Sequence, residues 1–228
     1  MKYDSLFDVI GRIMVGPSSS HTAGACRIAY VTRQIFDKEI KNAKIILHGS
    51  FADTYKGHGT DKALIAGLLG IGPENDKLRQ SFKIAKERGF DFIFHKKDLG
   101  SSYHPNTVLI EVSDEENSSL KVIGSSIGGG NIIITEIDDI NAGFNADLPT
   151  FVIKIKDLLD EGVLISKINE LFVEQEINYE NLGIWRNKQT QTTLIWIETN
   201  LDEQNKRNIL IEKFMKWENV EMVRLIDV

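Results

Sequence analysis

Apolar and polar positions repeat with two different periods along the chain, and each period predicts a type of secondary structure. Between residues 20 and 37 the apolar stripe recurs every three or four residues, which predicts a long helix; its members are Ala25, Ile28, Ala29, Thr32, Ile35 and Phe36. The same spacing predicts shorter helices over 5–15, 62–69 and 76–88. Short runs of branched residues predict strands over 43–51, 91–94, 106–112 and 131–137. The mixture indicates an α+β protein.

The last third of the chain changes to a β-α-β-β-α-β order. Its elements are predicted over 151–155, 161–175, 177–186, 191–198, a helix capped by Asp202 and reaching 217, and 220–226. This order is that of a ferredoxin-like unit. Residues 138–149 lose both periods and predict a linker. We therefore expect two domains, residues 1–143 and residues 150–228.

Composition narrows the classes of function. The 228 residues carry a net charge of −6 with scattered Lys and Arg, which argues against a nucleic-acid-binding protein. No run approaches the roughly 20 apolar residues of a membrane span, and the first residues lack an apolar signal core. We expect a cytoplasmic protein that acts on small molecules. Cys26 is the single cysteine, so this chain by itself cannot hold an internal disulfide or a thiolate-ligated cluster.

The stretch Gly16-Pro17-Ser18-Ser19-Ser20-His21-Thr22-Ala23-Gly24 is a turn that enters the long helix. Unpaired N–H groups at a helix start attract anions, and hydroxyl groups beside them favour a carboxylate or a phosphate. The same field disfavours an imidazolium ion, so we expect His21 to be neutral near pH 7, as a general base must be. Serines also cap helices without any further role, and that interpretation stays open. A phosphate loop is less favoured, because no Gly-Lys-Ser/Thr follows.

Three other loops hold candidate residues. The segment 55–61 contains His58 and leads into a helix that Thr60 or Asp61 is predicted to cap. In the segment 103–106, Pro105 forces His104 into an extended conformation and aims the residues around it. Three glycines at 128–130 predict a tight hairpin, a bulge or a close backbone approach to a ligand. A surface loop explains His58 as well as a role at a site does, and an ordinary proline turn is the favoured explanation of His104 at this point.

Taken together, these stretches resemble the beta chain of iron–sulfur-dependent L-serine dehydratase, also called L-serine ammonia-lyase. The resemblance rests on 5–11, 16–24, Gly49-Ser50-Phe51, 55–61, 104–107 and 126–130, in the same order over residues 1 to 137. It implies an N-terminal domain similar to the allosteric substrate-binding domain of some phosphoglycerate dehydrogenases. Residues 150–228 look like an ACT domain. The resemblance therefore covers nearly the whole chain.

The resemblance implies that L-serine is deaminated to pyruvate and ammonia. It implies a [4Fe–4S] cluster whose open iron binds the substrate hydroxyl, with its cysteine ligands on a separate, cysteine-rich alpha chain. It also implies that His21 is the base or a close partner of the base. The residues expected to bind the substrate are Ser18, Ser19, Ser20, Thr22, His58, Asp61, His104 and Asn106. No metal ligand is expected in this chain.

The ACT-like half departs from the usual family pattern. Its loop after the first strand, residues 156–162, is longer than usual and lacks a proline. Asp157 and Gly162 are the candidates for contacts with an effector, and a role in pairing between copies of the chain is an equal alternative. A non-catalytic, amino-acid-sensing regulatory subunit is the alternative function for the protein as a whole.

Overall fold

The structure is a computed structural model that describes residues 14–227. The chain divides into two compact units, one that ends at Asp138 and one that begins at Asp139. The helix predicted over 5–15 falls almost wholly outside the described residues. No helix in the described part of the chain combines the length and the apolar character needed to cross a membrane.

The first unit is built on a mixed β-sheet. Its strands are β1 (Asn42–Leu47), β2 (Asp91–Lys96), β3 (Thr107–Ser113), β4 (Ser119–Gly128) and β5 (Asn131–Ile137). They lie side by side in the order β2-β1-β3-β4-β5. Strands β1 and β2 are parallel, and the other neighbours are antiparallel. The glycines at 128–130 close the hairpin between β4 and β5, each with a positive φ, so the hairpin interpretation is confirmed.

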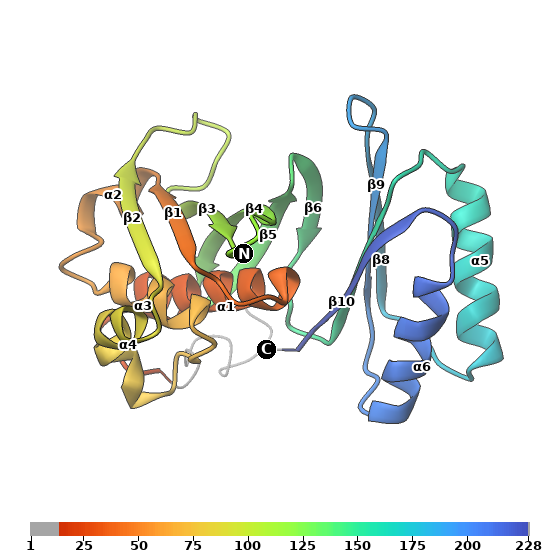
Figure 1. The fold of residues 1–228 in the computed structure, drawn as a ribbon, viewed down its shortest axis with the longest axis horizontal. Helices are drawn as coiled ribbons and strands as arrows, with labels where there is room; N and C mark the ends of the chain where they lie inside the picture. Colours follow the sequence, from red (N-terminus) through yellow and green to blue (C-terminus); the bar gives the residue numbers. More distant parts are fainter. Residues whose placement is uncertain (1–13, 228) are drawn as a thin grey trace. The chain divides into compact units, whose positions relative to one another are not determined.

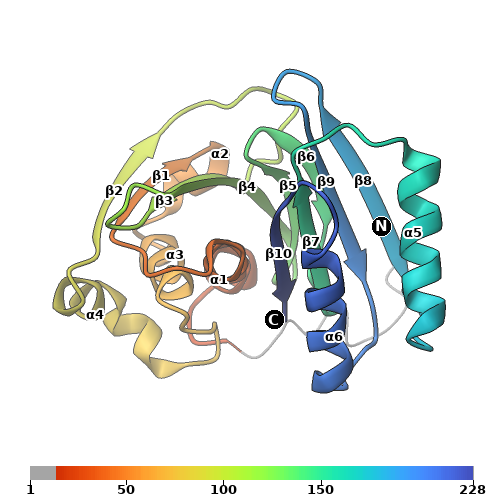
Figure 2. The same cartoon turned by 45° about the vertical axis from the view of Figure 1, so that its right-hand side comes forward.

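The long predicted helix is α1 (Ala25–Phe36), and all six residues of the predicted stripe are buried. It lies beside α3 (Thr60–Leu68) on one face of the sheet (Figure 1, Figure 2). Gly67 permits this contact, because a Cβ there would lie 2.2 Å from the carbonyl oxygen of Cys26. The two helices therefore pack with their backbones in close approach.

Several predicted boundaries in this unit were wrong. The first strand ends at Leu47, and the next residues form the short helix α2 (Gly49–Thr54), because Gly49 turns the chain with φ +53°. Neither Thr60 nor Asp61 caps α3; its N-cap is Gly59, in the left-handed conformation. The segment predicted as one helix over 76–88 divides into a 3₁₀ turn, η3 (Asp76–Gln80), and α4 (Ser81–Glu87).

The second unit contains the predicted β-α-β-β-α-β order. Its elements are β7 (Thr150–Ile155), α5 (Glu161–Glu174), β8 (Asn181–Asn187), β9 (Thr192–Glu198), α6 (Gln204–Met215) and β10 (Val220–Ile226). The strands form an antiparallel sheet in the order β10-β7-β9-β8. Helices α5 and α6 cover one face of this sheet (Figure 2). Phe151, Phe172 and Phe214 lie in the core between them.

Two predictions for this part of the chain were wrong. The expected linker contains the strand β6 (Ile140–Phe144), whose alternate residues are buried. It is held in part by the indole N–H of Trp196, which donates to the carbonyl of Ala142 at 3.1 Å. Asp202 does not cap α6, because its carboxylate lies 3.6 Å from the Arg207 guanidinium and the N-cap is Glu203.

The contact between α1 and α3 generates a stability prediction. We expect Gly67→Ala to destabilise the chain by about 1–3 kcal/mol, because the added methyl group forces the two helices apart. Gly57→Ala is the matched control: its Cβ would meet only a carbonyl at 3.6 Å, so the change should stay within about 0.5 kcal/mol. Urea denaturation followed by circular dichroism measures both. Equal stability of the two variants would contradict the proposed role of Gly67.

Candidate active site

The serine-rich turn enters the first helix through a π-helical segment, η2 (Ser19–Gly24), rather than directly as an α-helix. Ser18 is its N-cap and accepts a hydrogen bond from the backbone N–H of His21 at 3.2 Å. The capping interpretation therefore holds for Ser18. The side chains of Ser19 and Ser20 are half-buried, and the described residues offer their hydroxyls no hydrogen-bond partner. Such wide π turns occur often at functional sites.

The imidazole of His21 lies against residues from two other segments. Its Nε2 is 3.1 Å from the Oγ of Ser50, which lies at the start of α2. The ring of Phe51 meets it in a T-shaped arrangement with centroids 5.2 Å apart. His58 lies in the loop before α3, and the centroid of its ring is 4.9 Å from the centroid of the His21 ring. Two segments that are distant from His21 in the sequence thus surround its half-buried imidazole.

Burial lowers the pKa of His21 from its ordinary value of 6.5, and the nearby His58 lowers this pKa further. A hydrogen bond with the backbone of Ser50 opposes both effects and raises this pKa. The neutral form that we expected near pH 7 is therefore favoured. Desolvation and a neighbouring histidine, which the sequence prediction did not include, are the two causes that lower this pKa.

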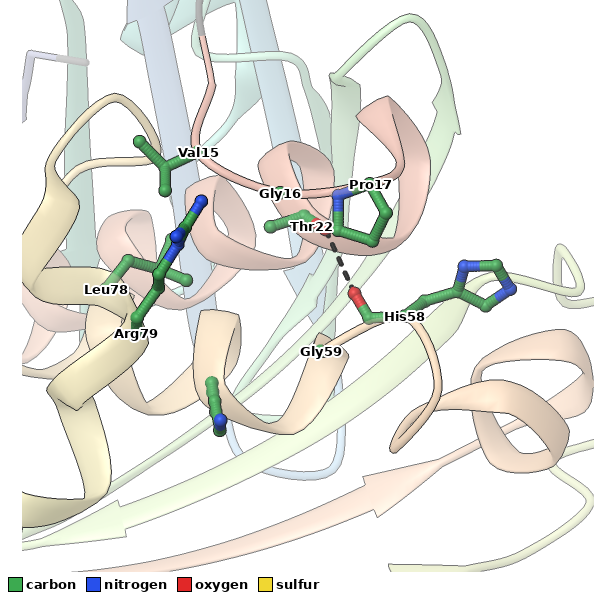
Figure 3. A pocket seen from close by; sticks show the side chains of 9 residues that line it. Val15, Gly16, Pro17, Thr22, His58, Gly59, Leu78 and Arg79 are labelled. Atoms are coloured by element: carbon green, nitrogen blue, oxygen red, sulfur yellow. Dashed lines mark hydrogen bonds between the residues drawn. The ribbon is translucent and has the colours of Figure 1, made fainter.

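Thr22 ties the first helix to the loop that carries His58. Its hydroxyl donates to the backbone carbonyl of His58 at 3.1 Å, and its side chain is buried. Because that donation uses the one hydroxyl proton, Thr22 can only accept from a ligand. In Figure 3 the His58 carbonyl faces Thr22, whereas the His58 imidazole points away. The bond therefore fixes the backbone of the loop and leaves the ring free to lie beside His21.

A cleft of about 390 Å³ lies on the other side of this bond (Figure 3). Its lining residues are Val15, Gly16, Pro17, Thr22, His58, Gly59, Lys62, Leu78 and Arg79. The walls are mostly apolar, and Lys62 and Arg79 add two positive charges.

The loop before β3 approaches the same region. The carbonyl of Asn106 accepts from the backbone N–H of Ser126 at 2.9 Å. The amide oxygen Oδ1 of Asn106 is buried and has no hydrogen-bond partner among the described residues. His104 is exposed, and its Nδ1 accepts from the backbone N–H of Asn106 at 3.1 Å, which closes the turn at Pro105. The structure therefore gives His104 a local role in this turn.

Asp61 lies in the first turn of α3, where its carboxylate accepts from the backbone N–H of Lys62 at 2.8 Å. Burial raises the pKa of Asp61. No hydrogen bond or ring contact joins Asp61 to His21 among the described residues. Sequence reasoning gave no role to Ser50 or Phe51, although Gly49-Ser50-Phe51 was one of the motifs; their contacts with His21 depend on the tertiary fold.

The described residues of this chain do not fit an iron–sulfur cluster. They contain no group of three or more histidine, cysteine or acidic side chains arranged to hold a metal ion. Cys26 is buried, its thiol donates to the carbonyl of Ile71 at 3.2 Å, and burial raises the pKa of that thiol. A thiol kept protonated is a poor metal ligand, because metals bind the thiolate.

In the second unit, the two candidate effector residues make local hydrogen bonds. The carboxylate of Asp157 accepts from the backbone N–H of Leu158 at 2.7 Å. The backbone carbonyl of Asp157 accepts from the hydroxyl of Thr193 at 2.6 Å. The N–H of Gly162 donates to the capping carboxylate of Asp160 at 2.9 Å. These bonds hold the loop against the sheet and start α5.

Comparisons with known proteins agree with one another. A family model described as the serine dehydratase beta chain matches residues 5–137. The chain is 42% identical to the L-serine dehydratase beta chain of Peptoniphilus asaccharolyticus over 96% of this chain and 98% of that one. It is 37% identical to the probable L-serine dehydratase beta chain of Bacillus subtilis, over 99% of each chain. It also matches the L-serine dehydratase of Haemophilus influenzae, at 32% identity over 57% of this chain and 33% of that protein. The chain belongs to the L-serine dehydratase beta chain family.

Proposed function

We propose that this chain is the beta subunit of an L-serine ammonia-lyase that converts L-serine to pyruvate and ammonia. The observation that carries the proposal is the half-buried imidazole of His21, whose pKa is lowered and whose Nδ1 has no hydrogen-bond partner among the described residues. Such a group can accept a proton at neutral pH. The names of the related chains supply the substrate.

In this proposal the serine-rich turn holds the substrate carboxylate. Ser19 and Ser20 supply hydroxyl donors, and Ser18 orders the turn by capping it. The buried Oδ1 of Asn106 suits the substrate ammonium group, because an unpaired buried amide oxygen costs about 1–3 kcal/mol. Thr22, His58, Asp61 and His104 belong to the same proposed site and act through its loops.

His21 then removes the α-proton of the bound serine. The ring is neutral at the outset, and it becomes an imidazolium ion as the proton is transferred. Loss of this proton and of the β-hydroxyl group leaves an aminoacrylate. Hydrolysis of the aminoacrylate gives pyruvate and ammonia. The partly buried position of His21 excludes some of the water that would otherwise compete for the proton.

We also propose that a separate alpha chain holds a [4Fe–4S] cluster. The donor set of this chain supports that division, because its single thiol is buried and protonated. When bound, such a cluster supplies a Lewis-acidic iron for the departing hydroxyl group. The two-chain enzyme would work in the cytoplasm.

For the second unit we propose an ACT domain that pairs copies of the chain. The strand order β10-β7-β9-β8 and the two helices on one face support a ferredoxin-like unit. The candidate effector residues Asp157 and Gly162 are already bonded within the chain, which favours pairing over effector binding. For the first unit we propose similarity to the allosteric substrate-binding domain of phosphoglycerate dehydrogenases.

Replacement of His21 tests the proposed reaction. In enzyme assembled with the alpha chain and iron under anaerobic conditions, His21→Ala should lower serine deamination at least 100-fold, the usual effect of losing a general base. His95→Ala is the matched control, because His95 is exposed on β2 and should leave the rate unchanged. Activity of the His21 variant within a few-fold of the parent would remove His21 from catalysis and favour a sensing function.

The lowered pKa of His21 predicts a pH dependence. His58→Ala should raise the pKa of His21, since the positive charge of a protonated His58 opposes protonation of its neighbour. Imidazole carbon NMR of the full-length chain measures this pKa directly. The acid limb of the kcat/KM profile should move to higher pH in parallel. An unchanged His21 pKa would show that His58 does not act on it.

The lowered pKa of His21 also determines how the stability of the fold changes with pH. The folded chain binds a proton at His21 less readily than the unfolded chain does. The contribution of the neutral His21 to the free energy of unfolding is therefore complete above the ordinary pKa of 6.5. It is lost as the pH falls through the lowered pKa. In urea denaturation at pH 5 and pH 8, the loss at pH 5 should be smaller for a His21→Gln variant than for the parent. Equal losses would contradict this linkage.

A further inference from the structure

The two ring nitrogens of His21 differ in their surroundings. Nε2 lies 3.1 Å from the hydroxyl oxygen of Ser50, a hydrogen-bond distance. Nδ1 has no hydrogen-bond partner among the described residues. A ligand can therefore reach a free nitrogen only at Nδ1.

A neutral imidazole carries one proton, and the position of that proton decides what the ring can do. If Ser50 donated to Nε2, the proton would lie on Nδ1, and the free nitrogen could not accept another. If Ser50 accepts from Nε2–H, Nδ1 is unprotonated and can act as a base. This step rests on the proposed role of His21 as the base.

Ser50 is held in place by its backbone. Gly49, with φ +53°, packs so closely on the next loop that a Cβ would lie 2.7 Å from the carbonyl oxygen of Pro105. That same carbonyl accepts from the N–H of Phe51 at 3.4 Å. The hydroxyl of Thr54 donates to the carbonyl of Ser50 at 2.8 Å. The Ser50 side chain thus stands on a turn that is fixed on both sides.

We propose that Ser50 is a positioning residue, which accepts a hydrogen bond from His21 Nε2–H and so presents an unprotonated Nδ1 to the substrate. The bond also strengthens during proton transfer, because an imidazolium N–H is a charge-assisted donor. An interaction that grows as charge develops lowers the barrier more than one of constant strength. A hydroxyl oxygen that accepts from the ring N–H stabilises the imidazolium form, so the side chain of Ser50 acts to raise the pKa of His21.

The first test is nitrogen NMR of the full-length chain. We expect the neutral His21 ring to carry its proton on Nε2, and the opposite tautomer would overturn the proposal. Ser50→Ala should lower the pKa of His21, and Ser50→Thr should restore it by returning the hydroxyl. Ser101→Ala, at an exposed serine, is the control, and it should change neither the tautomer nor the pKa of His21.

The second test is steady-state kinetics of the assembled enzyme. Ser50→Ala should lower kcat about tenfold or more with little change in KM, shift the acid limb of the kcat/KM profile to lower pH, and be rescued by Ser50→Thr. An inactive His21→Ala variant beside a fully active Ser50→Ala variant would overturn the role of Ser50 while the proposed function stands. A shifted pKa in Ser50→Ala beside full activity of His21→Ala would instead refute the proposed function.

Discussion

The site depends on the burial of helix α1. This helix packs against both α3 and the sheet, and glycines permit the two close approaches. These are Gly67 on α3, and Gly124 on β4, where a Cβ would lie 2.7 Å from the side chain of Ile28. A third close contact joins Gly24 to Ser126, where an added Cβ would lie 2.1 Å from the serine hydroxyl. Because α1 is held on several sides, the π turn that precedes it projects His21 in a defined direction.

The features that could be predicted from the sequence are those that a repeating burial pattern determines. The six-residue stripe of α1 was correct because a helix packed on one face buries every third or fourth residue. The boundaries of the elements that lie near glycine residues were predicted wrongly. Gly49 follows a strand pattern, and only its close packing on Pro105 shows that the chain turns there into a helix. The strand β6 was missed because it is only five residues long and because its own Asn141 and Gly143, with Asp138 and Asp139 before it, are residues that favour turns.

The candidate site could be predicted only in part, for a similar reason. The sequence marked His21 and His58 as separate loop residues, and the fold brings their rings to 4.9 Å. The direction of the His21 pKa shift was predicted correctly, but two causes of it, burial and the nearby ring of His58, follow only from the tertiary fold. Ser50 belongs to one of the family motifs, Gly49-Ser50-Phe51, but its contact with the ring of His21 exists only in the folded chain.

The distribution of chemical groups among the described residues supports the proposal that this chain works with a partner. The proposed general base has to be neutral and partly desolvated, and the packing of His21 within its own unit gives it both properties. Thiolate ligands require the opposite environment, in which negative charge is stabilised by metal or by nearby positive groups. The buried Cys26, bonded to the carbonyl of Ile71, is an apolar packing residue of α1. In the proposed two-chain enzyme, metal ligands on a second chain would let each polypeptide keep the environment that its own groups need, and the reacting atoms would meet where the two surfaces join.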